Sequence, residues 1–214
     1  MGNKIPELYD RHKICIICEG SEEKKYLEKL ISLNVWNNQY DISLVDAEGN
    51  GNIPARYQEK FQVGSYEVVL VFCDTERKPH EQYEDIKRKI NEFHGVSNAA
   101  DEVVIFGNPC TMQIILSHWE SVKISSPSKA KNAKLIKKYT GINNYKARTD
   151  QIDFLMNLID QDNYNKMKGH INNLSHDDSE ISSTNFNKVI SWFENTNANW
   201  IEEINSKLEY ESEE

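Results

Sequence analysis

The feature that most constrains the fold is a short apolar run that ends abruptly on an acidic residue. Ile14–Cys18 (ICIIC) stops at Glu19-Gly20, and a run of this length bounded by glycine is typical of a strand buried on both faces in a parallel sheet. The charged segment after it carries apolar residues at helical spacing, namely Tyr26, Leu27, Leu30 and Ile31. The stretch therefore predicts a strand, a tight turn and a helix, with Glu19 at the carboxyl end of the strand, where open α/β sheets bind ligands.

The same alternation continues over the first 120 residues. Further strands are predicted at Tyr40–Val45, Glu67–Cys73 and Glu102–Phe106. Helices are predicted at about 21–33, 53–61, 83–93 and 112–119. Strands that alternate with helices favour an α/β, Rossmann-like fold, with a mostly parallel four-stranded sheet flanked by helices.

A second buried strand also ends on acidic residues. Glu67–Cys73 is followed by Asp74-Thr75-Glu76, and residues i and i+2 of an extended strand end point the same way. If the two strands are neighbours, Glu19 joins this pair, and like charges at close range raise one another's pKa unless a cation neutralises them. Carboxylate oxygens suit Mg²⁺, Mn²⁺ or Ca²⁺. The pattern predicts a metal site; the alternative is that Asp74 caps the following helix and Glu76 is solvated.

Two short motifs carry a resemblance to a known family. Glu19-Gly20-Ser21-Glu22-Glu23-Lys24-Lys25-Tyr26 is similar to the EG-x-T-E-x-x-Y motif of RloB-like proteins, with Glu22 in place of Thr. Gly107-Asn108-Pro109-Cys110-Thr111-Met112, which runs on to His118-Trp119, resembles their S-N-P-C-F-E motif, with Met112 in place of Glu. These proteins belong with the TOPRIM domains of topoisomerases, primases and overcoming-lysogenization-defect nucleases. The resemblance covers residues 13 to about 120.

The resemblance implies a TOPRIM-like fold and a metal-dependent nuclease acting on DNA or RNA in phage defence. It implies one or two Mg²⁺ or Mn²⁺ ions held by Glu19, Glu23, Asp74 and Glu76; Glu23 lies one helical turn beyond Glu19 and can reach the same place. It also implies an alternative, a catalytically silent TOPRIM module that binds a partner ATPase. A homo-oligomer is compatible with either.

The charge distribution favours a nucleic-acid partner. Ser121–Thr149 contains eight cations and no acidic residue, so a chain of net charge −9 carries −17 elsewhere. The candidate phosphate-binding residues are Lys129, Lys131, Lys134, Lys137, Lys138, Lys146 and Arg148, with Lys123 as the eighth cation. Tyr139 and Tyr145 lie among them and can stack on unpaired bases. The alternative is a solvated linker.

Beyond this segment the pattern is helical only. The prediction is a catalytic domain at 1–120, a basic connecting segment at 121–149, and a helical C-terminal subdomain at 150–214 that ends in an acidic tail, Glu209–Glu214. His176 with Asp177 and Asp178 is either a metal site or an acidic turn before a helix.

The remaining features narrow the choice of compartment and ligand. The four cysteines form no disulfide framework and are predicted to be reduced packing residues. No apolar run reaches 18 residues and no signal peptide is apparent, so a cytoplasmic protein is expected. Gly49–Gly51 leaves open a nucleotide-binding enzyme, although this loop lacks the established phosphate-binding motifs.

Overall fold

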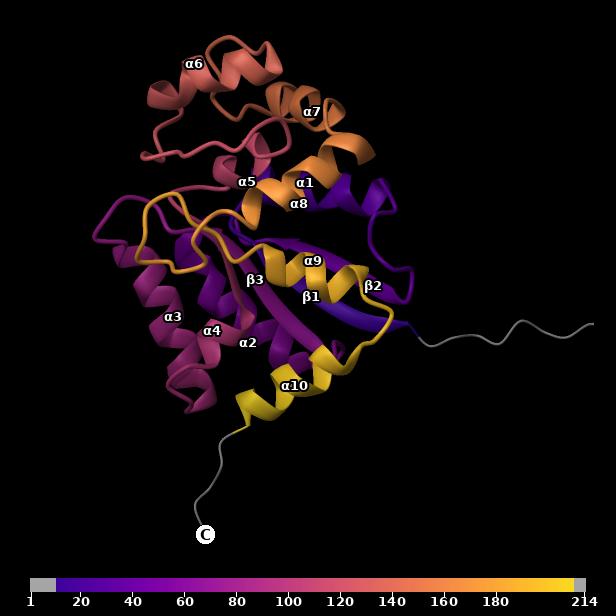
Figure 1. Ribbon diagram of the computed structural model, residues 1–214. Helices are drawn as coiled ribbons and strands as arrows, with labels where there is room; N and C mark the ends of the chain where they lie inside the picture. The colour runs from indigo at the N-terminus through magenta and orange to yellow at the C-terminus, as the bar shows by residue number, and fades with distance from the viewer. Residues whose placement is uncertain (1–10, 210–214) are drawn as a thin grey trace, which may run out of the picture.

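Four parallel strands form the centre of the protein, as seen in a computed structural model that describes residues 11–209 (Figure 1). The strands are β1 (His12–Cys18), β2 (Tyr40–Asp46), β3 (Val68–Asp74) and β4 (Val104–Gly107), in the order β2-β1-β3-β4. Every pairing is parallel. The predicted α/β fold with a four-stranded parallel sheet is therefore confirmed.

The burial of the strands follows from their sequence. The apolar runs of β1 and β3 occupy the two central positions, and their apolar side chains are almost wholly inaccessible to solvent. β2 lies at an edge and is less apolar, and most of its residues are half-buried. Strands covered on both faces need a continuous apolar sequence, whereas an edge strand does not.

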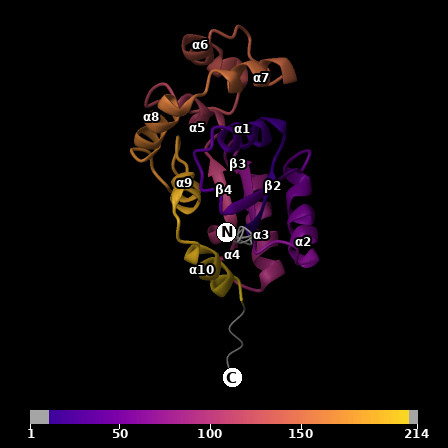
Figure 2. The ribbon, with the colours of Figure 1, turned by 90° about the vertical axis from the view of Figure 1, so that its right-hand side faces the viewer.

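Helices cover both faces of the sheet. α1 (Ser21–Ser32) follows β1, and α2 (Ile53–Val63) and α3 (Glu81–His94) follow β2 and β3. Figure 2 shows α2 on one side of the sheet and α9 on the other. α3 ends one residue after the predicted end, at the predicted turn, because Gly95 takes a left-handed φ of 69° that costs glycine nothing.

The prediction for the fourth strand is wrong at its start. Residues 99–103 form a short helix, α4 (Ala99–Val103), so Glu102 and Val103 are helical and the strand begins at Val104. Short apolar runs do not distinguish a strand from a buried helical turn. The helix after β4, α5 (Met112–Leu116), is shorter than the predicted 112–119.

The described residues after α5 add five helices and pack onto the same core. They are α6 (Lys129–Thr140), α7 (Thr149–Asn157), α8 (Gln161–Ile171), α9 (Asn187–Glu194) and α10 (Asn199–Leu208). Phe186, just before α9, packs on Tyr26 of α1 and on Phe72 of β3, with ring centroids 5.7 and 5.5 Å apart. Thr184 forms an antiparallel bridge to Gly107 at the end of β4. Buried residues from 121–149 and from the C-terminal helices belong to one hydrophobic cluster with the sheet.

Several smaller expectations can be compared with the structure. The basic segment contains a helix, α6, rather than only linker. All four cysteines are buried and free. No helix among residues 11–209 is long and apolar enough to cross a membrane. Of the predicted acidic tail, residues 210–214 lie outside the described part of the chain.

Candidate metal site

The strand order places Glu19 and Asp74 at the carboxyl ends of adjacent strands. The connection from β1 leads to β2 at one edge of the sheet, and the connection from β3 leads to β4 at the other edge. The strand order therefore reverses between β1 and β3. Cys18 lies opposite Phe72, and the Glu19 amide donates to the Phe72 carbonyl at 3.0 Å. Open α/β sheets bind their ligands in the crevice at such a point.

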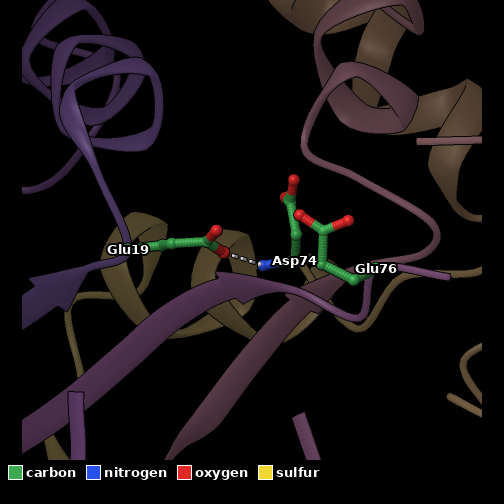
Figure 3. Close-up of side chains that lie close together, drawn as sticks. All are labelled: Glu19, Asp74 and Glu76. Atoms are coloured by element: carbon green, nitrogen blue, oxygen red, sulfur yellow. Dashed lines mark hydrogen bonds between the residues drawn. The ribbon is translucent and has the colours of Figure 1, made fainter. Parts of the chain in front are cut away.

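Three carboxylates converge there. Each of Glu19, Asp74 and Glu76 offers one oxygen, and these oxygens lie within 4.8 Å of one another. Figure 3 shows the Glu19 side chain reaching toward the side-by-side carboxylates of Asp74 and Glu76. We call these three residues the acidic triad; among residues 11–209 no other group of three potential metal ligands is this close.

Asp74 and Glu76 converge as predicted, but the reason given for it, an extended strand end, is wrong. The chain does not stay extended past Asp74, because Glu76 adopts a left-handed φ of 62°. A hydrogen bond from the Glu76 amide to the Pro109 carbonyl (3.1 Å) holds this turn against the loop that follows β4. The Thr75 amide likewise donates to the Gly107 carbonyl at 3.1 Å. The triad is thus assembled by a turn rather than by strand alternation.

In Glu19 and in Asp74, one carboxylate oxygen accepts hydrogen bonds that orient the side chain. Oδ1 of Asp74 accepts from the Thr111 amide (2.6 Å) and hydroxyl (2.8 Å), and Oε2 of Glu19 accepts from the Asp74 amide (2.9 Å). Gly107 makes the first contact possible, because a Cβ there would lie 2.9 Å from the backbone of Cys110 and Thr111. The other oxygen of each carboxylate has no donor among the described residues. Carboxylates held in this way are pre-oriented for a ligand.

The electrostatics of the triad are those of a site that lacks positive charge. Burial raises the pKa of Glu19 to about 7, and the charge of Glu76 adds to this, while the Asp74 amide opposes it. Burial and the charges of Glu23 and Glu19 raise the pKa of Asp74 well above its usual range. Because the ionised forms of Glu19 and Asp74 are disfavoured by burial and by neighbouring charges, a bound cation would stabilise them.

The residues present fit a hard divalent cation. All three ligands are carboxylate oxygens, which Mg²⁺, Mn²⁺ and Ca²⁺ prefer. Oxygens on opposite sides of a Mg²⁺ ion lie about 4.2 Å apart, so side-chain movements of less than about 1 Å would bring the triad onto one ion. The acidic triad can therefore hold a metal ion.

Glu23 lies next to this triad but is not one of its members. One of its oxygens accepts from the Gly20 amide at 3.1 Å, so the side chain caps the N-terminus of α1. Burial, together with the charges of Glu22 and Glu19, raises the pKa of Glu23 to about 8. Its predicted role as a metal ligand stays a prediction.

The basic segment docks on α1 through Glu22. Lys129 Nζ lies 2.7 Å from Glu22 Oε2, and the Tyr145 hydroxyl donates to the other oxygen of the same carboxylate. Burial lowers the pKa of Lys129, but the carboxylates of Glu22, Glu23 and Asp74 together outweigh it, and the net shift is upward. Sequence reasoning grouped Lys129 with the exposed lysines and missed both this link and Thr111, since each depends on contacts between distant segments.

The other candidate nucleic-acid residues lie on the surface of α6 and after it. Lys131, Lys134, Lys137 and Lys146 are exposed and form no ion pair with a described residue. Lys138 pairs with Glu120 at 3.2 Å, and Arg148 pairs with Asp150 at 3.3 Å. Both views place α6 beyond the carboxyl ends of the strands, the end that carries the triad (Figures 1 and 2).

The remaining candidate positions have structural partners. His176 Nδ1 lies 2.8 Å from the Thr184 carbonyl, and Asp178 accepts from Tyr83 and Lys87, so the alternative of a turn describes this loop. The Gly49 amide donates to the Glu19 carbonyl at 2.8 Å, which ties the loop after β2 to the triad.

Comparisons with known proteins add no assignment. A scan against protein-family models found no match, and neither did a search of the curated proteins or of the solved structures.

Proposed function

We propose that this chain is a TOPRIM-like nuclease that uses Mg²⁺ or Mn²⁺ to cleave phosphodiester bonds of DNA or RNA, in the phage-defence setting of the RloB-like proteins it resembles. The observation that carries the proposal is the approach of Glu19, Asp74 and Glu76 to within 4.8 Å at the point where the strand order reverses. The motifs that carry the resemblance contain Glu19 and Thr111, and Thr111 orients Asp74.

In this proposal the metal ion, the oriented carboxylates and the lysines of α6 have different roles. The chemistry that Mg²⁺ or Mn²⁺ supplies in such a site is polarisation of a phosphate oxygen, stabilisation of developing negative charge and activation of water. Thr111 and the Asp74 amide hold two of the carboxylates in place before a ligand arrives. The exposed lysines of α6 attract the phosphate backbone, which an otherwise acidic protein would repel.

The test is cleavage of end-labelled single- and double-stranded DNA and RNA with Mg²⁺, Mn²⁺ or EDTA. We expect cleavage with a divalent metal and none with EDTA, and loss of activity in Glu19→Gln, which keeps the shape but removes one ligand charge. Glu203→Gln, an exposed position on α10, is the matched control and should behave as wild type. Cleavage that persists in EDTA, or equally in Glu19→Gln, would contradict the proposal.

A further inference from the structure

A pocket of about 380 Å³ opens beside the acidic triad, and Glu76 forms part of its wall. The other walls come from segments far apart in the sequence: the turn after β3, the loop after β4, residues 125–127, the start of α6 and the loop between α8 and α9. This volume is at the small end of the range for ligand sites. It suits one small group rather than a length of duplex.

Part of the lining is apolar although the pocket is open to solvent. Pro109, Pro127 and Ile181 line it, and 59% of the Ile181 surface is exposed. A pocket lined by several apolar residues together with a few polar groups is typical of ligand sites. These apolar side chains can pack against the face of a nucleobase.

The two amides in the lining are fixed so that they offer acceptors. Nδ2 of Asn108 donates to the carbonyls of Asp178 and Glu180, both at 2.7 Å, and Nδ2 of Asn132 donates to the Ser126 carbonyl at 2.8 Å. Because these bonds fix the orientation of each amide, its Oδ1 is the atom left for other partners. Acceptors of this kind match the amino and ring N–H groups of bases, not a phosphate.

His80 adds another acceptor. Its Nδ1 lies 2.8 Å from the Thr75 carbonyl, which can only accept, so Nδ1 carries the hydrogen and the neutral ring has an acceptor at Nε2. This Nε2 is buried and has no hydrogen-bond partner among residues 11–209. A buried polar atom without a partner is uncommon. Because His80 lines the pocket, a donor that reached Nε2 would satisfy it.

Two cations of the kind that bind phosphate stand at the same pocket. Arg77 and Lys131 line it, both are exposed, and neither forms an ion pair with a described residue. Their charges are opposite in sign to that of Glu76 on the adjacent wall. The pocket thus combines apolar surface and acceptors for a base with cations for a phosphate, next to the carboxylates of the triad.

From these contacts we infer that the pocket takes one unpaired nucleotide, the neighbour of the phosphodiester that lies at the acidic triad. The inference rests on the proposed function and specifies its substrate class: single-stranded DNA or RNA, or an unpaired stretch within a folded nucleic acid. A base held in a stack by its complement cannot enter so small a pocket without being flipped out, which costs a few kcal/mol.

The test measures binding separately from cleavage. Fluorescence anisotropy in EDTA compares a labelled 12-nucleotide strand with the same strand annealed to its complement. We expect the single strand to bind about tenfold more tightly or better, and Ile181→Asp to lower its affinity by about tenfold while leaving duplex affinity unchanged. Ile31→Asp, at another exposed isoleucine on α1, is the matched control, and circular dichroism checks that both variants fold.

The outcomes separate this inference from the nuclease proposal. Equal binding of single strand and duplex, or equal affinities in Ile181→Asp and Ile31→Asp, overturns the pocket assignment even if cleavage is observed. A single-strand preference that depends on Ile181, without cleavage in any metal, upholds the pocket and contradicts the nuclease.

Discussion

The acidic triad and the basic surface of α6 are both charged, but they differ in how buried and how crowded their charged groups are. Glu19, Asp74 and Glu76 are partly buried and crowd together, and the pKa values of Glu19 and Asp74 are raised. Lys134 and Lys137 stand apart in solvent on α6. A charge that is buried among other charges changes interaction free energies by far more than a charge in water does. A change at the triad should therefore alter chemistry strongly, whereas a change on α6 should alter affinity modestly and in a salt-dependent way.

The largest effect is expected from Asp74→Asn. An asparagine Oδ1 can still accept both hydrogen bonds from Thr111, so the variant removes a ligand charge and little else. We expect kcat to fall by about 10² or more, if the lost charge stabilisation is worth several kcal/mol, with little change in affinity for the nucleic acid. Steady-state kinetics at saturating metal measure this. Asp41→Asn, an exposed position near the start of β2, should keep the wild-type rate, and an unchanged kcat in Asp74→Asn would place the chemistry elsewhere.

A smaller effect is expected from Lys134→Glu combined with Lys137→Glu. Lys138 is left unchanged because Glu120 already pairs with it. Losing two phosphate contacts should reduce the slope of log affinity against log salt by roughly 1.5 and weaken binding about tenfold at low salt, with kcat unaffected. Titrations over a range of salt concentrations measure both. Arg11→Glu with Lys13→Glu makes the same charge change at the other end of the sheet; if the two pairs behave alike, α6 has no special role.

The smallest effect concerns the stability of the metal-free protein. The pKa of Glu19 is raised from 4.5 to about 7, so the folded state keeps a proton that the unfolded state releases, and stability falls as pH rises through this window. Asp74→Asn removes one of the repelling charges and should raise Tm at pH 8 by about 2–4 °C for each kcal/mol relieved. The gain should shrink at pH 5, because Glu19, with a pKa of about 7, is then protonated and repels Asp74 less.

Thermal unfolding in EDTA at the two pH values tests this, with Asp41→Asn as the reference. A variant that is less stable than wild type at pH 8 would show that Asp74 acts as a structural anchor for Thr111, and that its charge is tolerated without a cation.

The sequence predicted the meeting of Glu19 and Asp74 for a sound physical reason. Two all-apolar runs belong at the centre of a parallel sheet, and neighbouring parallel strands end at the same edge, so residues that follow them must lie close. Periodicity and strand order are properties that a single sequence carries.

The supports of the site could not be predicted in this way. Thr111 reaches Asp74 only because Gly107 lets the loop after β4 approach closely, and Lys129 meets Glu22 across 107 positions of sequence. The left-handed conformation of Glu76 is held by Pro109 from another loop. Such contacts are set by tertiary packing, which cannot be predicted from hydrophobic periodicity or from the residues at the ends of strands.

A divalent cation at the acidic triad is central to the proposed activity. Crystals soaked in Mn²⁺, with anomalous data collected at a wavelength where manganese scatters strongly, show where the ion binds. We predict an anomalous peak in contact with carboxylate oxygens of Glu19, Asp74 and Glu76, absent from crystals of Asp74→Asn soaked in the same way. An empty triad at saturating Mn²⁺, or a peak that persists unchanged in Asp74→Asn, would contradict the central claim.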